Sequence, residues 1–123
     1  IDDEKFEVVT NADAFYENIK DVHILVYDEE TPDGVTNNRI ELSPDCVRVI
    51  KKGAVEAEME FVEGEEKEFS YKTSQGVIPF VALGKKIQYN LNACEFWAEF
   101  EYSLSVADFS QDCKMMIEAT VLV

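Results

Sequence analysis

The feature that most constrains the fold is a strict alternation of apolar and polar residues along residues 95–106. Apolar side chains occupy every even position from Phe96 to Val106, and the odd positions carry glutamate, serine and one tryptophan. Successive side chains of an extended strand point to opposite faces, so this pattern predicts a long strand with one buried face. A helix would scatter the glutamates around its axis.

The same two-residue period recurs along most of the chain, and turn-forming residues such as Pro32, Gly34 and Pro44 separate the runs. About ten short strands at near-regular spacing predict an all-β domain, either a barrel or a sandwich, with little or no helix. The further predicted strands are Phe6–Val9, Val22–Tyr27, Arg39–Leu42, Val47–Ile50, Val55–Val62, Phe69–Tyr71, Ile87–Leu91 and Met115–Val123.

One segment, Asp13–Lys20, also fits a helix. Asp13 can cap its first turn, and Phe15 and Ile19 are spaced four residues apart, as on one helix face. No linker, repeat or low-complexity tract divides the chain, so we expect residues 1–123 to form a single domain.

The charge balance excludes several partners. The chain has 26 acidic and 11 basic residues, which gives a formal net charge of -15. Nucleic acids and anionic lipids are bound through clusters of lysine and arginine, so we expect neither nucleic-acid nor membrane binding. The longest apolar run, residues 77–83, is interrupted by Pro79 and is too short to span a bilayer.

The three cysteines match no disulfide framework and no zinc-binding spacing. Cys46, Cys94 and Cys113 are an odd number and form no C-x-x-C pair, so they are typical of small buried residues in a reducing, cytoplasmic compartment. The chain opens with Ile1 and shows no basic-then-apolar signal sequence, and we expect that residues have been removed upstream.

No catalytic, cofactor or metal site survives a check of spacing. His23 is the only histidine, and a lone histidine in a strand-like run is usually structural. A calcium loop starting at Asp28 would place Arg39 where a bidentate glutamate is required. Paired carboxylates could serve a glycosidase, but those of residues 56–60 and 95–101 share the polar faces of their strands, which a solvated exterior explains.

The interior of the predicted barrel is the remaining candidate site. A barrel of eight to ten strands is either filled by its own side chains or holds one small ligand. The inward aromatic residues are bulky, which favours a filled core over a hollow one. The candidate barrel-lining residues are Phe69, Tyr71, Tyr89, Phe96, Phe100 and Tyr102.

Four short stretches together resemble the YwiB-like family of bacterial proteins of unknown function. They are the stretches of residues 26–30 (VYDEE), 50–55 (IKKGAV), 71–76 (YKTSQG) and 100–104 (FEYSL). The resemblance covers nearly the whole chain and implies an antiparallel up-and-down β-barrel of the lipocalin (calycin) type, with about 8–10 strands. It implies no activity for any residue.

The resemblance also implies a first strand upstream of the position of Ile1. Without that strand two backbone edges would stand open, and natural proteins cover or pair such edges. We therefore expect either a homodimer formed through an open sheet edge or a trimmed form of a longer chain.

The function expected from the sequence is non-catalytic binding of a small apolar ligand or of a protein partner. One alternative is an enzyme of unrecognised type that uses carboxylates and tyrosines at the barrel mouth. Another is an interaction module whose open edge accepts a strand from a partner.

Overall fold

The computed structural model describes residues 12–91 and 95–120, without the side chains of Leu91 and Phe96, and these residues form nine antiparallel strands in two sheets. The first sheet has the order β1-β2-β3-β4-β5 and the second the order β6-β7-β8-β9, so each strand pairs with its neighbour in sequence. The strands are β1 (Phe15–Ile19), β2 (Val22–Thr31), β3 (Gly34–Leu42), β4 (Cys46–Gly53), β5 (Ala57–Val62), β6 (Glu66–Thr73), β7 (Gly76–Leu91), β8 (Glu95–Val106) and β9 (Phe109–Thr120).

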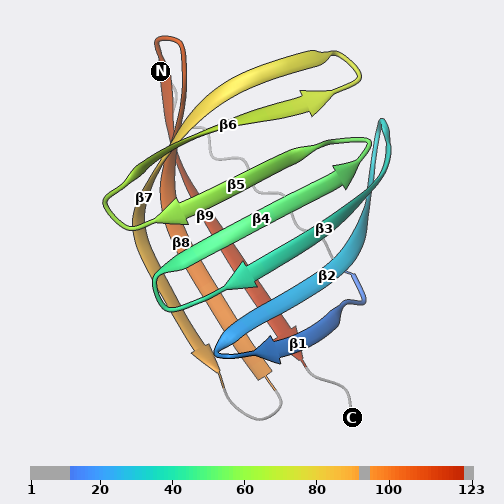
Figure 1. The fold of residues 1–123 in the computed structure, drawn as a ribbon, viewed down its shortest axis with the longest axis vertical. Coiled ribbons are helices and arrows are strands. Elements are labelled where there is room, and N and C mark those ends of the chain that lie inside the picture. Colours follow the sequence, from blue (N-terminus) through green and yellow to red (C-terminus); the bar gives the residue numbers. More distant parts are fainter. Residues whose placement is uncertain (1–11, 92–94, 121–123) are drawn as a thin grey trace.

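The predicted all-β, up-and-down architecture is confirmed, and the strand predicted at residues 95–106 has the bounds of β8. Strands β2–β5 cross in front of β8 and β9 (Figure 1), and the core lies between the two sheets. The predicted strand Phe6–Val9 lies outside the described residues, as does the end of the run predicted to reach Val123.

The helical alternative for residues 13–20 is wrong. Residues Phe15–Ile19 form β1, which pairs with β2 from Ile19 opposite Val22 to Phe15 opposite Val26. The turn between them is Lys20-Asp21, and both residues have positive φ angles of 50° and 67°. Two such residues form the type I′ turn that matches the twist of a two-stranded hairpin, and this pairing overrides the helical spacing of Phe15 and Ile19.

The two sheets are joined beside Gly84 in β7. Isolated bridges pair Glu56 with Lys72 and Glu63 with Gly84, and the register of β7 shifts between Gly84 and Lys86. A side chain at Gly84 would meet the backbone of Val62, because a Cβ atom there would lie 2.4 Å from the Val62 carbonyl oxygen. Glycine thus allows β5 and β7 to approach closely at this point.

In the part of the chain that the structure describes, no ladder joins β1 to β9. Instead of one continuous closed sheet, the described strands form two sheets that meet at β5–β6 and stand apart between β1 and β9. The predicted homodimer through an open edge stays a prediction.

The core follows the two-residue period. Phe100 is 1% exposed, and its ring lies 5.3 Å from that of Phe61 and 5.5 Å from that of Tyr102, measured between centroids. Burial of such side chains is the main favourable contribution to folding. The buried cluster comprises Leu25, Ile40, Leu42, Val47, Val49, Ala57, Met59, Phe61, Ala82, Ala98 and Phe100.

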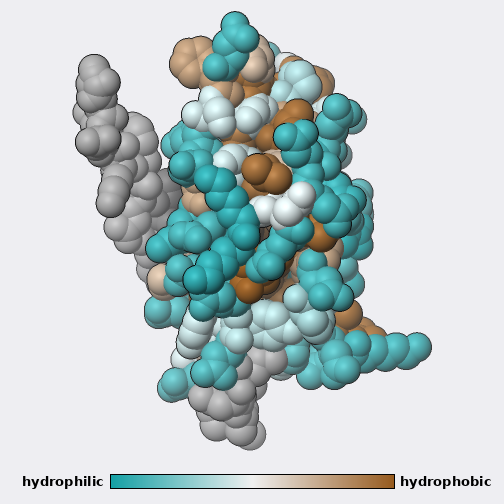
Figure 2. All heavy atoms as spheres, turned by 90° about the vertical axis from the view of Figure 1, so that its left-hand side faces the viewer, coloured by the Kyte–Doolittle hydropathy of each residue, from teal (hydrophilic) through white to brown (hydrophobic). Residues whose placement is uncertain are grey.

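Much of the exterior is polar. Figure 2 shows one side of the molecule, on which hydrophilic side chains dominate and hydrophobic ones appear between them. The glutamates of β5 follow the predicted pattern, since Glu58 is exposed while its neighbours Ala57 and Met59 are buried. Among the described residues no helix is long and apolar enough to cross a bilayer.

Candidate functional site

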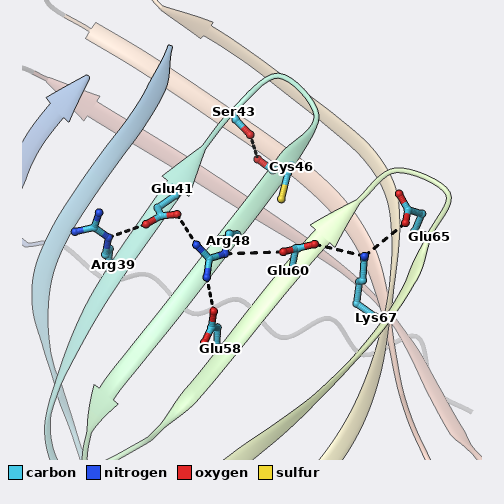
Figure 3. A network of polar contacts seen from close by, with 9 residues as sticks. All are labelled: Arg39, Glu41, Ser43, Cys46, Arg48, Glu58, Glu60, Glu65 and Lys67. Carbon is cyan, nitrogen blue, oxygen red and sulfur yellow. Dashed lines mark hydrogen bonds and ion pairs between the residues drawn. The ribbon is translucent and has the colours of Figure 1, made fainter. Parts of the chain in front are cut away.

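A network of charged side chains covers the outer face of β3, β4 and β5 (Figure 3). Arg48 lies at its centre and pairs with Glu41, with 3.0 Å between Nη1 and Oε1, and with Glu58. Arg39 donates from Nε to the other oxygen of Glu41 at 2.8 Å. Arg48 of β4 lies opposite Glu41 of β3 and Glu60 of β5 and neutralises carboxylates on both neighbouring strands, so the network is explained as a stabilised exterior.

The hydrogen bond from Arg39 and the charges of both arginines lower the pKa of Glu41 below its ordinary value of 4.5. The folded chain therefore binds this proton less readily than the unfolded chain. The stabilisation is complete above the ordinary pKa and is lost as the pH falls through the folded value.

We expect Glu41→Gln to lower the free energy of unfolding by about 0.5–1 kcal/mol at neutral pH, because it removes the charge on which both arginines converge. The difference from the unmodified protein should shrink as the pH falls below 4.5, since the native carboxylate is then progressively protonated. Urea unfolding at a series of pH values measures this. If the difference in the free energy of unfolding stayed constant down to strongly acidic pH, the charge of Glu41 would not be the source of the stabilisation.

A second polar group, which we call the inner polar cluster, faces the interior and consists of Tyr27, Glu29, Asn38, Lys51 and Tyr71. Lys51 Nζ donates to Asn38 Oδ1 at 2.7 Å and lies 3.5 Å from Glu29 Oε1. Asn38, which is fully buried, donates from Nδ2 to the same Glu29 oxygen at 3.3 Å. The side chains of Lys51 and Glu29 are only 18% and 25% exposed, so this ion pair is half-buried.

The alternation of side chains along β2 and β4 places Glu29 and Lys51 of the inner polar cluster on the inward faces of these strands. Leu25, Tyr27 and Glu29 occupy successive inward positions of β2, and Leu25 belongs to the buried core. On β4 the buried Val49 precedes Lys51 by two residues in the same way. Burial, followed by the charge of Glu29, raises the pKa of Tyr27 and of Tyr71, so both phenols are neutral hydrogen-bonding groups at physiological pH.

A cavity of about 790 Å³ opens beside this cluster. One wall belongs to β1 and β2 and the other to β9, so the cavity occupies the place where the two sheets stand apart. Apolar residues such as Leu25, Ile40 and Ile117 line it together with polar ones, among them Glu29 and Lys51. The lining residues are Ala12, Asp13, Ala14, Phe15, Tyr16, Leu25, Tyr27, Glu29, Ile40, Lys51 and residues 115–120.

Four of the six predicted barrel-lining residues, Phe69, Tyr71, Tyr89 and Tyr102, pack half-buried against the core, and Phe100 is part of it. The side chain of Phe96 lies outside the described part of the chain. Among the described residues, the large cavity is lined by other side chains, and the rings of these five residues pack within or against the core. Burial raises the pKa of Tyr102 to about 12, as expected for a phenol in a packed interior.

His23 lies on the inner face of β2 and is buried. Its Nδ1 is hydrogen-bonded to the Tyr16 hydroxyl at 2.6 Å, the planes of the two rings are nearly parallel, and the Tyr89 ring lies 6.3 Å away. These contacts explain the histidine as a structural residue of the inner face, as its sequence position indicates.

The acidic run at residues 28–30 does not converge on one point. Asp28 and Glu30 are exposed, whereas Glu29 faces inward, because successive residues of β2 alternate. Asp28 accepts a hydrogen bond from Asn37 Nδ2 at 3.1 Å. The enzymatic alternative stays a prediction, and Glu29 with the nearby Tyr27 and Tyr71 is an inward carboxylate and tyrosine set that such an enzyme could use.

Sequence reasoning missed the inward placement of Glu29 and Lys51. It assigned the glutamates of residues 56–60 to a solvated exterior, which holds for Glu56 and Glu58, and it did not separate Glu29 from its exposed neighbours. The signal was present, because the alternation of the apolar runs continues for one more step, from Tyr27 to Glu29 and from Val49 to Lys51.

Comparison with known protein families matches residues 1–117 to the family described as Domain of unknown function (DUF1934). Among solved structures, the chain is similar to the ywiB protein from Bacillus subtilis, known from a crystal structure, with 24% sequence identity and a TM-score of 0.84. This similarity covers 99% of the present chain and 85% of that chain. Comparison with curated proteins gives no match. The family match extends over nearly the whole length and agrees with the resemblance seen in the sequence, and we conclude that the chain belongs to the YwiB-like family DUF1934.

Proposed function

We propose that this protein is a non-catalytic binding protein that holds one small, largely apolar ligand between β1, β2 and β9. The observation that carries the proposal is the cavity of about 790 Å³, whose volume falls in the range of about 300–1,000 Å³ typical of small-molecule sites. Its apolar side chains, among them Leu25, Ile40 and Ile117, would cover the body of such a ligand. Lipocalins, which hold one small ligand inside an eight-stranded β-barrel, provide an analogy for such a site.

Native mass spectrometry of the protein purified from its own host tests the proposal. We expect one noncovalent ligand per chain. A ligand present at a hundred times its dissociation constant adds about 2.7 kcal/mol to the stability of the folded state, which raises the melting temperature by several degrees. The proposal would be contradicted if the purified protein carried no ligand in this experiment and its melting temperature did not rise with ten-carbon amphiphiles.

A matched pair of variants locates the ligand. Ala119 is a half-buried cavity residue on the inner face of β9, and Ala119→Trp should fill the cavity and abolish binding. Lys114 is an exposed residue of the same strand, so Lys114→Trp should leave binding unchanged. Equal losses in both variants would place the ligand elsewhere.

An edge-binding protein is the second candidate. It is favoured by β1, which is the edge of the first sheet among the described strands and whose Phe15 and Ile19 are 82% and 49% exposed. An unpaired edge can accept a strand from a second chain. The same native mass spectrum reports subunit number together with ligand, so a dimer without ligand would favour this candidate and a ligand-bound monomer the first.

A further inference from the structure

We infer that the inner polar cluster recognises the head group of the ligand, and that this head group is uncharged and able both to donate and to accept hydrogen bonds, as an alcohol or a primary amide is. This inference rests on the proposed function, because it assigns a ligand class to the same cavity. The inner polar cluster is a polar feature of the interior that core packing does not require.

Core packing alone does not explain the half-buried ion pair between Glu29 and Lys51, because burying charged groups costs free energy. Charges removed from water lose solvation, and replacing a buried ion pair with apolar residues is often neutral or stabilising. Both side chains lie on the cavity wall, and Asn38 holds them by donating to Glu29 and accepting from Lys51. The cluster is therefore well ordered and presents charged groups to whatever occupies the cavity.

The chemistry of the cluster selects the head group. The Lys51 ammonium has three donor hydrogens and the two oxygens of Glu29 have about four acceptor sites, and the bonds to Asn38 and the ion pair use part of each set. A hydroxyl or amide that lies beside the ion pair can accept from Lys51 and donate to Glu29, and it leaves their mutual attraction intact.

An anionic head group is disfavoured by its surroundings. Of the charged residues that border the cavity, Glu29 and Lys51 are half-buried, whereas Asp13 and Glu118 are acidic residues exposed at its rim. A carboxylate ligand near Lys51 would also lie close to Glu29, and like charges in a half-buried site repel strongly. A cationic head would compete with Lys51 for the same Glu29 oxygens.

Three ten-carbon probes that differ only in the head group test this: decanol, decanoate and decylamine. With the unmodified protein, calorimetric titration should show decanol binding at least about tenfold more tightly than decanoate, which corresponds to about 1.4 kcal/mol. Decanoate binding as tightly as decanol would overturn the inference without any variant being needed.

Two substitutions should shift the preference in opposite directions. Glu29→Gln keeps the shape but removes the negative charge, so the affinity for decanoate should rise about tenfold while that for decanol changes less than about threefold. Lys51→Met leaves Glu29 without its ammonium partner, so the affinity for decylamine should rise by a similar factor. The neighbouring residues provide matched controls, because Glu30 and Lys52 are exposed. Glu30→Gln and Lys52→Met should leave all three affinities unchanged.

The outcomes separate the inference from the proposed function. If none of the probes binds to the unmodified protein or to any variant, the proposed function fails and the inference fails with it. If the probes bind but their order is the same in Glu29→Gln, Lys51→Met and the controls, the cavity binds ligand and only the head-group assignment is wrong.

Discussion

Replacing Phe100 with alanine is expected to lower the free energy of unfolding by about 3–5 kcal/mol, as typical for a large aromatic residue removed from a packed core. The side chain is 1% exposed and contacts the rings of Phe61 and Tyr102, one from each sheet. The expected loss has two parts. One is the favourable free energy of burying the ring away from water, and the other is the cost of the cavity that alanine leaves between the sheets. Urea unfolding followed by circular dichroism measures it.

Phe109 provides the control for this substitution. It follows the turn between β8 and β9 and is 79% exposed, so Phe109→Ala should change the stability by no more than about 0.5 kcal/mol. Similar losses at Phe100 and Phe109 would mean that the two-residue period does not divide the chain into an inner and an outer face.

Gly53→Ala is expected to be the second large effect, with a loss of about 2–6 kcal/mol. Gly53 has a φ angle of +126°, which costs a residue with a side chain about 1–3 kcal/mol of strain. A Cβ atom there would also lie 2.5 Å from the Val35 carbonyl oxygen and 3.3 Å from Thr36 Cα. Moving this backbone should add about 1–3 kcal/mol and disturb Thr36, which is fully buried.

Gly76 separates strain from crowding. Its φ angle of +130° is nearly that of Gly53, but nothing lies within 4 Å of the position that a Cβ atom would take. Gly76→Ala should therefore show the strain alone, and the difference between the two variants in urea unfolding should be about 1–3 kcal/mol. Equal losses of stability in the two variants would show that the backbone of β3 does not crowd a side chain at position 53.

The sequence allowed the strands to be predicted because period-two patterning is a local signal. In β8 the core-facing residues from Ala98 to Leu104 are each followed by a glutamate or a serine, and the pattern sets both the strand bounds and the buried face. β1 was harder, since Phe15 and Ile19 are exposed and their spacing also fits a helix. The short turn Lys20-Asp21 decides between these structures through pairing with β2, which is a contact between segments rather than a property of either.

The candidate site could be predicted only in part. The sequence led us to expect a site in the interior, and Phe100, which was expected there, lies in the core. The cavity depends on how far β9 stands from β1 and β2, which no local pattern encodes. The inner polar cluster draws on residues as distant as Glu29, Lys51 and Tyr71, and only the folded sheets bring their side chains together.

A crystal structure of the protein grown with decanol tests the central claim most directly, because it shows where a ligand lies and what its head group touches. We predict continuous ligand density between β2 and β9, with the apolar tail along Leu25 and Ile117 and the hydroxyl within hydrogen-bond distance of Lys51 and Glu29. A cavity filled by the protein's own side chains, or decanol bound only on the outer surface, would contradict the account.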